Sequence, residues 1–151
     1  ISMLTPWYIT GFCDGEAAFS FSRSGGTLAL YFAIKQREDN RQIIEDIRAY
    51  FNYVGNIYIS KASKPTKNSG FTKPSAYYRV TRIGELKVII DHFDKYPLQS
   101  EKKREAYNIW RQMVIHKTEN YRDIDYNILR ELAMKLSSLN PQSRAFKIHT
   151  R

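Results

Sequence analysis

Two acidic residues, Asp14 and Glu16, lie close together near the start of the chain, within residues 6–19, PWYITGFCDGEAAF. Thr5 and Pro6 favour a helix start just before them, because threonine caps a first turn and proline fits the first helical position. The acids would then end the helix, where its dipole prefers cations. Carboxylates and free helix carbonyls suit a hard divalent cation such as Mg²⁺. The stretch therefore indicates either a metal site or the solvated end of a packed helix, and spacing alone does not separate the two.

Small residues lie on one side of the same predicted helix. Gly11 and Gly15 are four positions apart, so they share a face, and Thr10 is beside them. The missing side chains let another backbone approach this face closely. We therefore predict a helix–helix seam formed by Thr10, Gly11 and Gly15.

The length of 151 residues fits one domain with a full hydrophobic core, so residues 1–151 are expected to form a single domain in which residues 142–151 are a basic tail. Cys13 is the single cysteine, which excludes an internal disulfide and favours a reducing, intracellular setting. No run of about 18 apolar residues occurs, so no membrane span is expected.

The charge distribution points to an anionic partner. The chain has 24 Lys and Arg against 15 Asp and Glu, a net charge of +9. Residues 17–37 and 47–84 contain ten Lys and Arg and no acid. Because solvated surfaces normally mix both signs, this pattern favours a face that binds phosphates. The alternative is a generally basic composition without a defined ligand face.

Alternating apolar and polar residues predict four strands. Residues 18–24 and 27–36 alternate on either side of Gly25-Gly26, which predicts a hairpin with one apolar face. Residues 55–61 alternate next, with Ile57 and Ile59 expected to face inward, and a strand over residues 75–82 follows. A basic loop with proline and glycine, residues 61–74, separates these two strands.

Helical spacing of apolar residues predicts the remaining elements over residues 40–51, 83–96 and 100–116, and in a last helix that Asp123 caps. Asp39 or Asn40 can cap the first of these helices and Ser100 the third. The resulting fold class is α+β, with a four-stranded antiparallel sheet and helices on one face.

If the helices cover the apolar face, the other face of the sheet presents hydrogen-bonding and basic side chains. A twisted ribbon of this kind can enter the DNA major groove and read base edges, whereas its tyrosines could equally stack on RNA bases. The residues expected to contact nucleic acid are Ser20, Ser22, Ser24, Tyr31, Ala33, Lys35, Asn56, Tyr58, Ser60, Lys61, Lys64, Lys67, Lys73, Tyr77, Arg79 and Thr81.

Residues 9–17, ITGFCDGEA, resemble the LAGLIDADG motif of homing endonucleases. The supporting segments are FAIKQREDNR at 32–41, GNIY at 55–58 and IIDHFDKYPLQSEKK at 89–103, in the family's order and at similar spacing. The resemblance covers nearly the whole chain. It implies the αββαββα homing endonuclease domain, with a saddle-shaped sheet.

The resemblance also implies roles for individual residues. Glu16 matches the acid that binds the catalytic divalent metal, with help from the Gly15 carbonyl, and Asp14 matches the acid that serves structure at the helix end. Gln36 resembles the polar residue that positions solvent, and Lys102 resembles the basic residue near the scissile phosphate. Ala17 departs from the motif's usual last glycine, and its extra methyl could slow cleavage.

A single motif implies a homodimer that cuts a long, roughly palindromic double-stranded DNA site, with Mg²⁺ or another hard divalent metal shared near the two-fold axis. Two alternatives stay open. One is a group I intron maturase that binds intron RNA, and the other is one half of a two-motif, pseudo-symmetric endonuclease. The family further suggests an intron-encoded protein of an organelle, a mitochondrion or a chloroplast.

Overall fold

The computed structural model describes residues 4–61 and 74–139 of the chain. Within these ranges the elements follow the expected order of helix, two strands, helix, two strands and helices, with a short 3₁₀ turn added before the second helix. The bounds are α1 (Pro6–Glu16), β1 (Ala17–Ser24), β2 (Thr27–Arg37), η1 (Glu38–Asn40), α2 (Arg41–Tyr50), β3 (Asn56–Ser60), β4 (Ser75–Val80), α3 (Ile83–Lys95), α4 (Glu101–Glu119) and α5 (Tyr126–Ser138).

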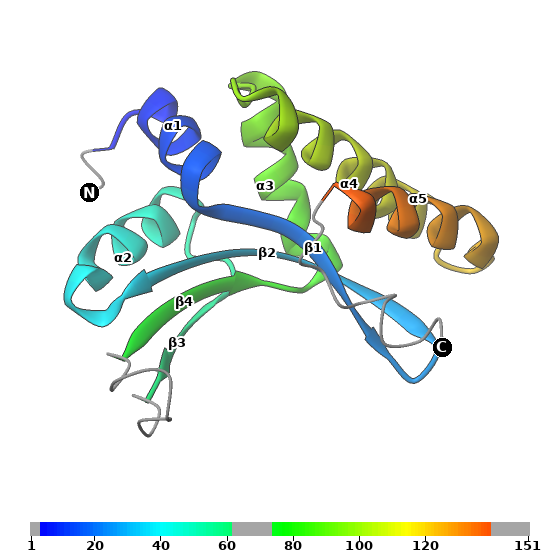
Figure 1. The fold of residues 1–151 in the computed structure, drawn as a ribbon, viewed down its shortest axis with the longest axis horizontal. Coiled ribbons are helices and arrows are strands. Elements are labelled where there is room, and N and C mark those ends of the chain that lie inside the picture. Colours follow the sequence, from blue (N-terminus) through cyan, green and yellow to red (C-terminus); the bar gives the residue numbers. More distant parts are fainter. Residues whose placement is uncertain (1–3, 62–73, 140–151) are drawn as a thin grey trace.

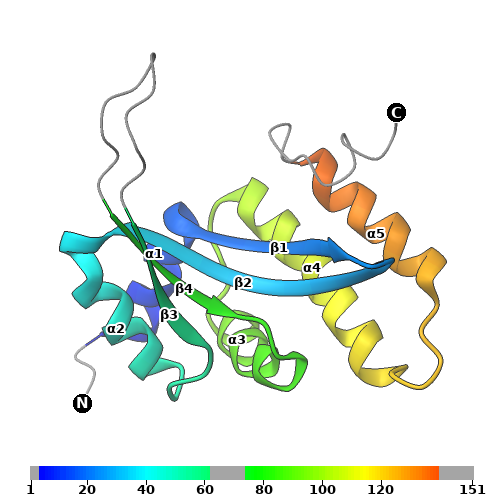
Figure 2. The same cartoon turned by 90° about the horizontal axis from the view of Figure 1, so that it is seen from below.

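The sheet is antiparallel, with the strand order β1-β2-β4-β3. Gly25 and Gly26 form the β1–β2 turn at φ values of +54° and +87°, a region that glycine enters without strain. Figures 1 and 2 show the helices on one side of the twisted sheet and the strands open on the other side. The predicted fold class is therefore confirmed.

The core lies between the sheet and the helices, as the alternation predicted. Leu30, Phe32 and Ile34 of β2 are buried, and the residues between them face the open side. Phe19 of β1 stands at the centre of an aromatic cluster, with ring centroids 5.3 Å from Phe93 and 5.2 Å from Trp110. Edge-to-face and tilted contacts of this kind add to the stability that burial provides. They attach α3 and α4 to the hairpin.

Three side chains of α4, spaced seven residues apart, bond to backbone carbonyls of the β1–β2 hairpin. Lys103 Nζ donates to the carbonyl of Ala17, Trp110 Nε1 to that of Ser20 at 3.1 Å, and Lys117 Nζ to that of Leu28 at 2.6 Å. Seven residues are close to two turns of a helix, so all three lie on one stripe. The helix is therefore bonded along most of the hairpin's length.

Four local expectations need correction. Ile59 is 45% exposed because β3 is an edge strand and α2 packs on β2 and β4 instead. Asp125, not Asp123, caps α5, through bonds from the N–H groups of residues 127 and 128. Asn40 precedes α2 without a side-chain cap, and Asp39 pairs with Arg37. Ser100 precedes α4 but does not cap it, because its hydroxyl bonds elsewhere.

Cys13 is fully buried, and burial raises the pKa of its thiol. Across residues 4–61 and 74–139, none of the helices combines the length and apolarity needed to cross a membrane.

Candidate active site and nucleic-acid interface

The candidate site is the junction at which α1 runs into β1. Thr5 caps α1 by accepting the N–H of Tyr8 at 3.1 Å, and the N–H of Ala17 closes the last turn on the Cys13 carbonyl. Ala17 is 2% exposed and belongs to the core, whereas Glu16 is exposed. The methyl that distinguishes Ala17 from the usual glycine therefore packs into the protein interior.

Asp14 fastens the end of α1 to the start of α4. Its carboxylate accepts the backbone N–H of Gln99 at 2.9 Å, the N–H of Ser100 at 3.1 Å and the Ser100 hydroxyl at 2.8 Å. Partial burial alone would raise the pKa of Asp14, but these bonds stabilise the carboxylate and hold its pKa below the usual value. Asp14 thus occupies the N-terminal end of α4, where the helix dipole favours an anion.

Lys103 contacts this junction directly, although the sequence analysis singled out its neighbour Lys102. Its half-buried ammonium donates to the Ala17 carbonyl, directly after Glu16. Burial lowers the pKa of Lys103, while the nearby charges of Asp14 and Glu16 act in the opposite direction. A cation therefore stands at the C-terminal end of α1, which the helix dipole favours. The sequence signal was only a second lysine beside Lys102.

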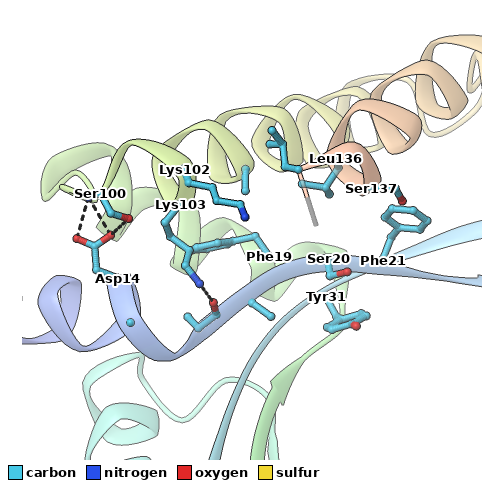
Figure 3. A pocket seen from close by; sticks show the side chains of 15 residues that line it. Asp14, Phe19, Ser20, Phe21, Tyr31, Ser100, Lys102, Lys103, Leu136 and Ser137 are labelled. Atoms are coloured by element: carbon cyan, nitrogen blue, oxygen red, sulfur yellow. Dashed lines mark hydrogen bonds between the residues drawn. The ribbon is translucent and has the colours of Figure 1, made fainter. Parts of the chain in front are cut away.

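A pocket of about 550 Å³ opens between the end of α1, β1, α4 and α5. Figure 3 shows Lys102 and Lys103 entering it from α4, with Ser20 and Tyr31 on the sheet side. Gly15 and Asp14 also line it. Lys102 and Gly15 thus line the same hollow, which is basic along α4.

A second hollow, of about 290 Å³, lies on the open face of the sheet. Its lining consists of Glu16, Ala18, Tyr31, Ala33, Lys35, Tyr77 and Arg79. Ala18 and Tyr31 line both hollows, so the two are adjacent. Glu16 is accordingly next to the face predicted to contact nucleic acid. Gln36 lines neither hollow: it is half-buried on β2, opposite Ala76 of β4.

Two cation–π pairs hold side chains in place on the open face of the sheet. The Arg79 guanidinium lies 4.3 Å from the ring centroid of Tyr31, and Lys35 Nζ lies 5.5 Å from that of Tyr77. Of the residues expected on this face, Ser20, Tyr31, Ala33, Tyr77 and Arg79 are half-buried, and Ser22, Lys35, Asn56, Tyr58, Ser60, Lys61 and Thr81 are exposed. Lys64, Lys67, Lys73 and the side chain of Ser24 lie outside the described residues.

Of the three residues predicted to form a seam on α1, Gly11 and Gly15 are on the surface and Thr10 is not. Both glycines are exposed, and a Cβ added to either would meet no heavy atom within 4 Å. Thr10 is 1% exposed and faces the core, because it shares the buried side of α1 with Ile9 and Cys13. Its assignment to the seam was wrong.

Thr10 takes part in a buried network that joins three helices. Its hydroxyl donates to the Tyr96 carbonyl at 2.8 Å, so its oxygen accepts the N–H of His92 Nε2 at 3.0 Å. His92 Nδ1 is then the acceptor for the Tyr50 hydroxyl at 2.9 Å. Burial lowers the pKa of His92 to about 4, so the ring is neutral at pH 7.

The oxygen ligands that the junction offers suit a hard divalent cation, but they are too few to complete its coordination. Glu16 forms no salt bridge within the described ranges, and carbonyls of the last helical turn lack intrahelical donors. Carboxylate and carbonyl oxygens are the ligands that such a cation takes. However, the described residues hold no group of three or more His, Cys, Asp or Glu side chains that could bind a metal.

Residues 9–114 match the family described as LAGLIDADG endonuclease. The chain is 34% identical over 124 residues to "Uncharacterized 50.9 kDa protein in ND4 intron 1" of Podospora anserina, an alignment that covers 76% of this chain and 25% of the relative. It is 31% identical over 145 residues to "Probable intron-encoded endonuclease 2" of Neurospora crassa, and this alignment covers 91% of this chain and 29% of the relative.

Among solved structures, the chain is similar to the LAGLIDADG meganuclease I-AabMI bound to uncleaved DNA, with a TM-score of 0.76 and 30% identity. This similarity covers 97% of the chain and 48% of I-AabMI. The chain therefore spans about half of that meganuclease and less than a third of the two curated relatives.

Proposed function

We propose that this chain, which belongs to the LAGLIDADG endonuclease family, reads and cuts double-stranded DNA at a specific site. One observation carries the proposal: the exposed Glu16 carboxylate borders the open sheet face, whose strands present basic and hydrogen-bonding side chains. A surface that only gripped DNA would gain nothing from an acid there, since a carboxylate repels phosphates. An acid that binds a metal gives the position a use.

The sheet provides the DNA-binding surface. No helix of the described residues covers its open face (Figure 2), and Tyr31, Lys35, Tyr77 and Arg79 line the hollow there. The major groove of B-DNA is about 12 Å wide and accepts a β-ribbon, whose side chains can then meet base edges. Exposed Asn56, Tyr58 and Ser60 on β3 extend the same surface to the sheet edge.

Glu16 and the Gly15 carbonyl would hold Mg²⁺ or another hard divalent cation, and DNA phosphates together with a second motif would supply the remaining oxygens. Such a cation activates water and stabilises the leaving oxygen of a phosphodiester. Lys102 lines the same pocket as Gly15, and its ammonium would bind a DNA phosphate there. Gln36 remains assigned to solvent positioning by its match to the family alone.

A second LAGLIDADG helix completes the proposed site by packing on the exposed face of α1. Gly11 and Gly15 leave this face open to close approach, and Trp7 and Tyr8 on the same helix are 53% and 48% exposed. Two assemblies would supply this second helix: another copy of this chain in a homodimer, or a similar domain on one longer polypeptide. The span of about half of I-AabMI favours the longer polypeptide.

The compartment follows from the proposed role. Two relatives carry names that refer to introns or intron-encoded proteins, one of them to ND4 intron 1. We infer that this chain is also intron-encoded and acts in an organelle.

The test is selection of cleaved sites from a randomised duplex library in the presence of Mg²⁺, with the wild-type protein and the Glu16→Gln variant in parallel. The wild type should enrich one long site, and the variant should bind this site but cut it more than about a hundredfold more slowly. A wild-type protein that cuts no duplex but binds intron RNA would overturn the proposal and favour the maturase. Equal cutting by the variant would remove Glu16 from the site.

The mass of the protein in solution, free and bound to the selected duplex, distinguishes the two assemblies. A mass of two copies on one duplex supports the homodimer. One copy on one duplex supports the alternative, in which this domain is one half of a longer polypeptide that carries two motifs.

A further inference from the structure

Arg79 lies at the side of the hollow next to Glu16, in a row of paired residues that crosses the sheet. Ala18 of β1 is paired with Ala33 of β2, Ala33 with Arg79 of β4, and Arg79 with Asn56 of β3. The two alanines are the smallest side chains of this row. They leave the hollow of about 290 Å³ in front of the guanidinium.

The Arg79 guanidinium is positioned by an aromatic ring. Its central carbon lies 4.3 Å from the centroid of Tyr31, whereas salt bridges within the described ranges involve other arginines. Its Nε is buried and has no hydrogen-bond acceptor among the described residues. The group is therefore oriented by stacking, and no carboxylate within those ranges engages its donors. Stacking on a ring fixes the plane of a guanidinium without using its N–H groups.

The backbone under Arg79 is also fixed. Gly55, at φ +73°, lies so close to β4 that an added Cβ would overlap the Arg79 carbonyl oxygen and come within 2.8 Å of Val80 Cγ2. This contact locks β4 against the turn that precedes β3. Both the main chain and the side chain of Arg79 are thus held in place before DNA arrives, which reduces the entropy lost on binding.

We propose that Arg79 is a specificity-determining residue that reads one guanine through the major groove, with Tyr31 as the positioning residue that holds its guanidinium. This inference rests on the proposed DNA-binding function. Guanine presents two acceptors, O6 and N7, side by side in that groove, and the two terminal amino groups of an arginine match them as a pair. The hollow beside Ala18 and Ala33 gives the base edge room to approach.

Lys35 on Tyr77 forms a contrasting pair on the same face. The ammonium lies 5.5 Å from the ring centroid, and the side chain is exposed. An ammonium is a compact charge without the planar fork of a guanidinium, so it strengthens binding to any phosphate backbone and selects bases weakly. Lys35 therefore serves as the matched control for Arg79.

The experiment is selection of bound duplexes from a randomised library in EDTA, which keeps them uncut, with the full-length protein. The wild type should require guanine at one position of the half-site that this domain contacts. Arg79→Ala and Arg79→Lys should each lower that preference by about 10- to 100-fold and leave the other positions unchanged. Lys35→Ala should weaken binding to all sites equally and should reduce its salt dependence.

Tyr31 variants test the positioning role. Tyr31→Ala should weaken the guanine preference at the same position. Tyr31→Phe should keep the wild-type preference, because the ring is retained. Preferences of Arg79→Ala and Arg79→Lys that equal the wild type would overturn the inference and leave the proposed function standing. A wild-type protein that selects no duplex would instead overturn the proposed function. Circular dichroism of each variant verifies that the fold is intact.

Discussion

The Asp14 carboxylate accepts the hydroxyl of Ser100 at 2.8 Å, so that the last turn of α1 is bonded directly to the residue that precedes α4, across 86 positions of the chain. Glu16 follows Asp14 by two residues, and Lys102 follows Ser100 by two. The two side chains proposed for cleavage are therefore each two residues away from one hydrogen-bonded contact.

Asp14→Asn should destabilise the fold by about 1–2 kcal/mol, because the amide keeps one acceptor but loses the charge that three donors share. Ser100→Ala, which removes the hydroxyl alone, should cost less. Urea denaturation at pH 7 measures both. Since the pKa of Asp14 is lowered in the folded state, its contribution is present above pH 4 and declines as the pH falls through the folded value. An Asp14→Asn variant as stable as the wild type would remove this role.

Lys103→Met and Lys102→Met should separate two roles that adjacent lysines of α4 play. Lys103 donates to the Ala17 carbonyl, so its loss should lower the free energy of unfolding by about 1–3 kcal/mol and reduce cleavage as well. Lys102 is exposed, so its loss should change stability by less than about 0.5 kcal/mol while it lowers cleavage. Thermal melts and single-turnover cleavage are the measurements. Equal stability losses for both variants would contradict this assignment.

Acid should weaken the fold through His92. Because burial lowers its pKa from 6.5 to about 4, the folded state binds fewer protons than the unfolded chain between these values. Its stabilising effect is therefore full above pH 6.5, declines as the pH falls, and is lost below about 4, a change of about 3 kcal/mol. The free energy of unfolding at pH 7 and pH 4.5, compared between the wild type and His92→Gln, isolates this effect. The same pH dependence in both proteins would show that His92 does not contribute.

Gly55→Ala should be strongly destabilising, by about 2–4 kcal/mol, since φ is +73° and the new methyl would strike the Arg79 carbonyl. Gly84→Ala is the matched control. Gly84 lies in α3 with no heavy atom within 4 Å of an added Cβ, so the substitution should stabilise by up to about 1 kcal/mol. Thermal unfolding of the two variants compares them directly. A tolerated Gly55→Ala would mean that β4 can shift at Arg79.

The helices and strands could be predicted from the spacing of apolar residues within each segment, because a strand or helix with one buried face has apolar residues at regular intervals. The alternation in residues 27–36 corresponds to the buried Leu30, Phe32 and Ile34 of β2. At the edges of the sheet, this spacing no longer predicts which residues are buried. Ile59 keeps the alternation of its strand although no helix of the described part covers it, so its apolar character alone misled the prediction.

Contacts between distant segments could not be predicted in this way. Asp123 and Asp125 are both acids before the same helix. Asp125 is the cap, and its backbone N–H is held by His116 of α4, whose Nε2 accepts it at 3.0 Å. Likewise, nothing in the sequence distinguishes Lys102 from Lys103, although only the structure shows that Lys103 bonds to the Ala17 carbonyl. The side of α1 that buries Thr10 is fixed by His92 and Tyr96, more than 80 residues away.

The stripe of Lys103, Trp110 and Lys117 has a mechanical consequence. These side chains bond α4 to the hairpin near its base, along β1 and close to its turn, so the hairpin and the helix form one stiff unit. Lys102 is part of that unit. When a mismatched duplex pushes the hairpin out of its preferred path, we expect the lysine to move with it and away from the phosphate. A wrong sequence would then lower the rate of cutting even where it still permits binding.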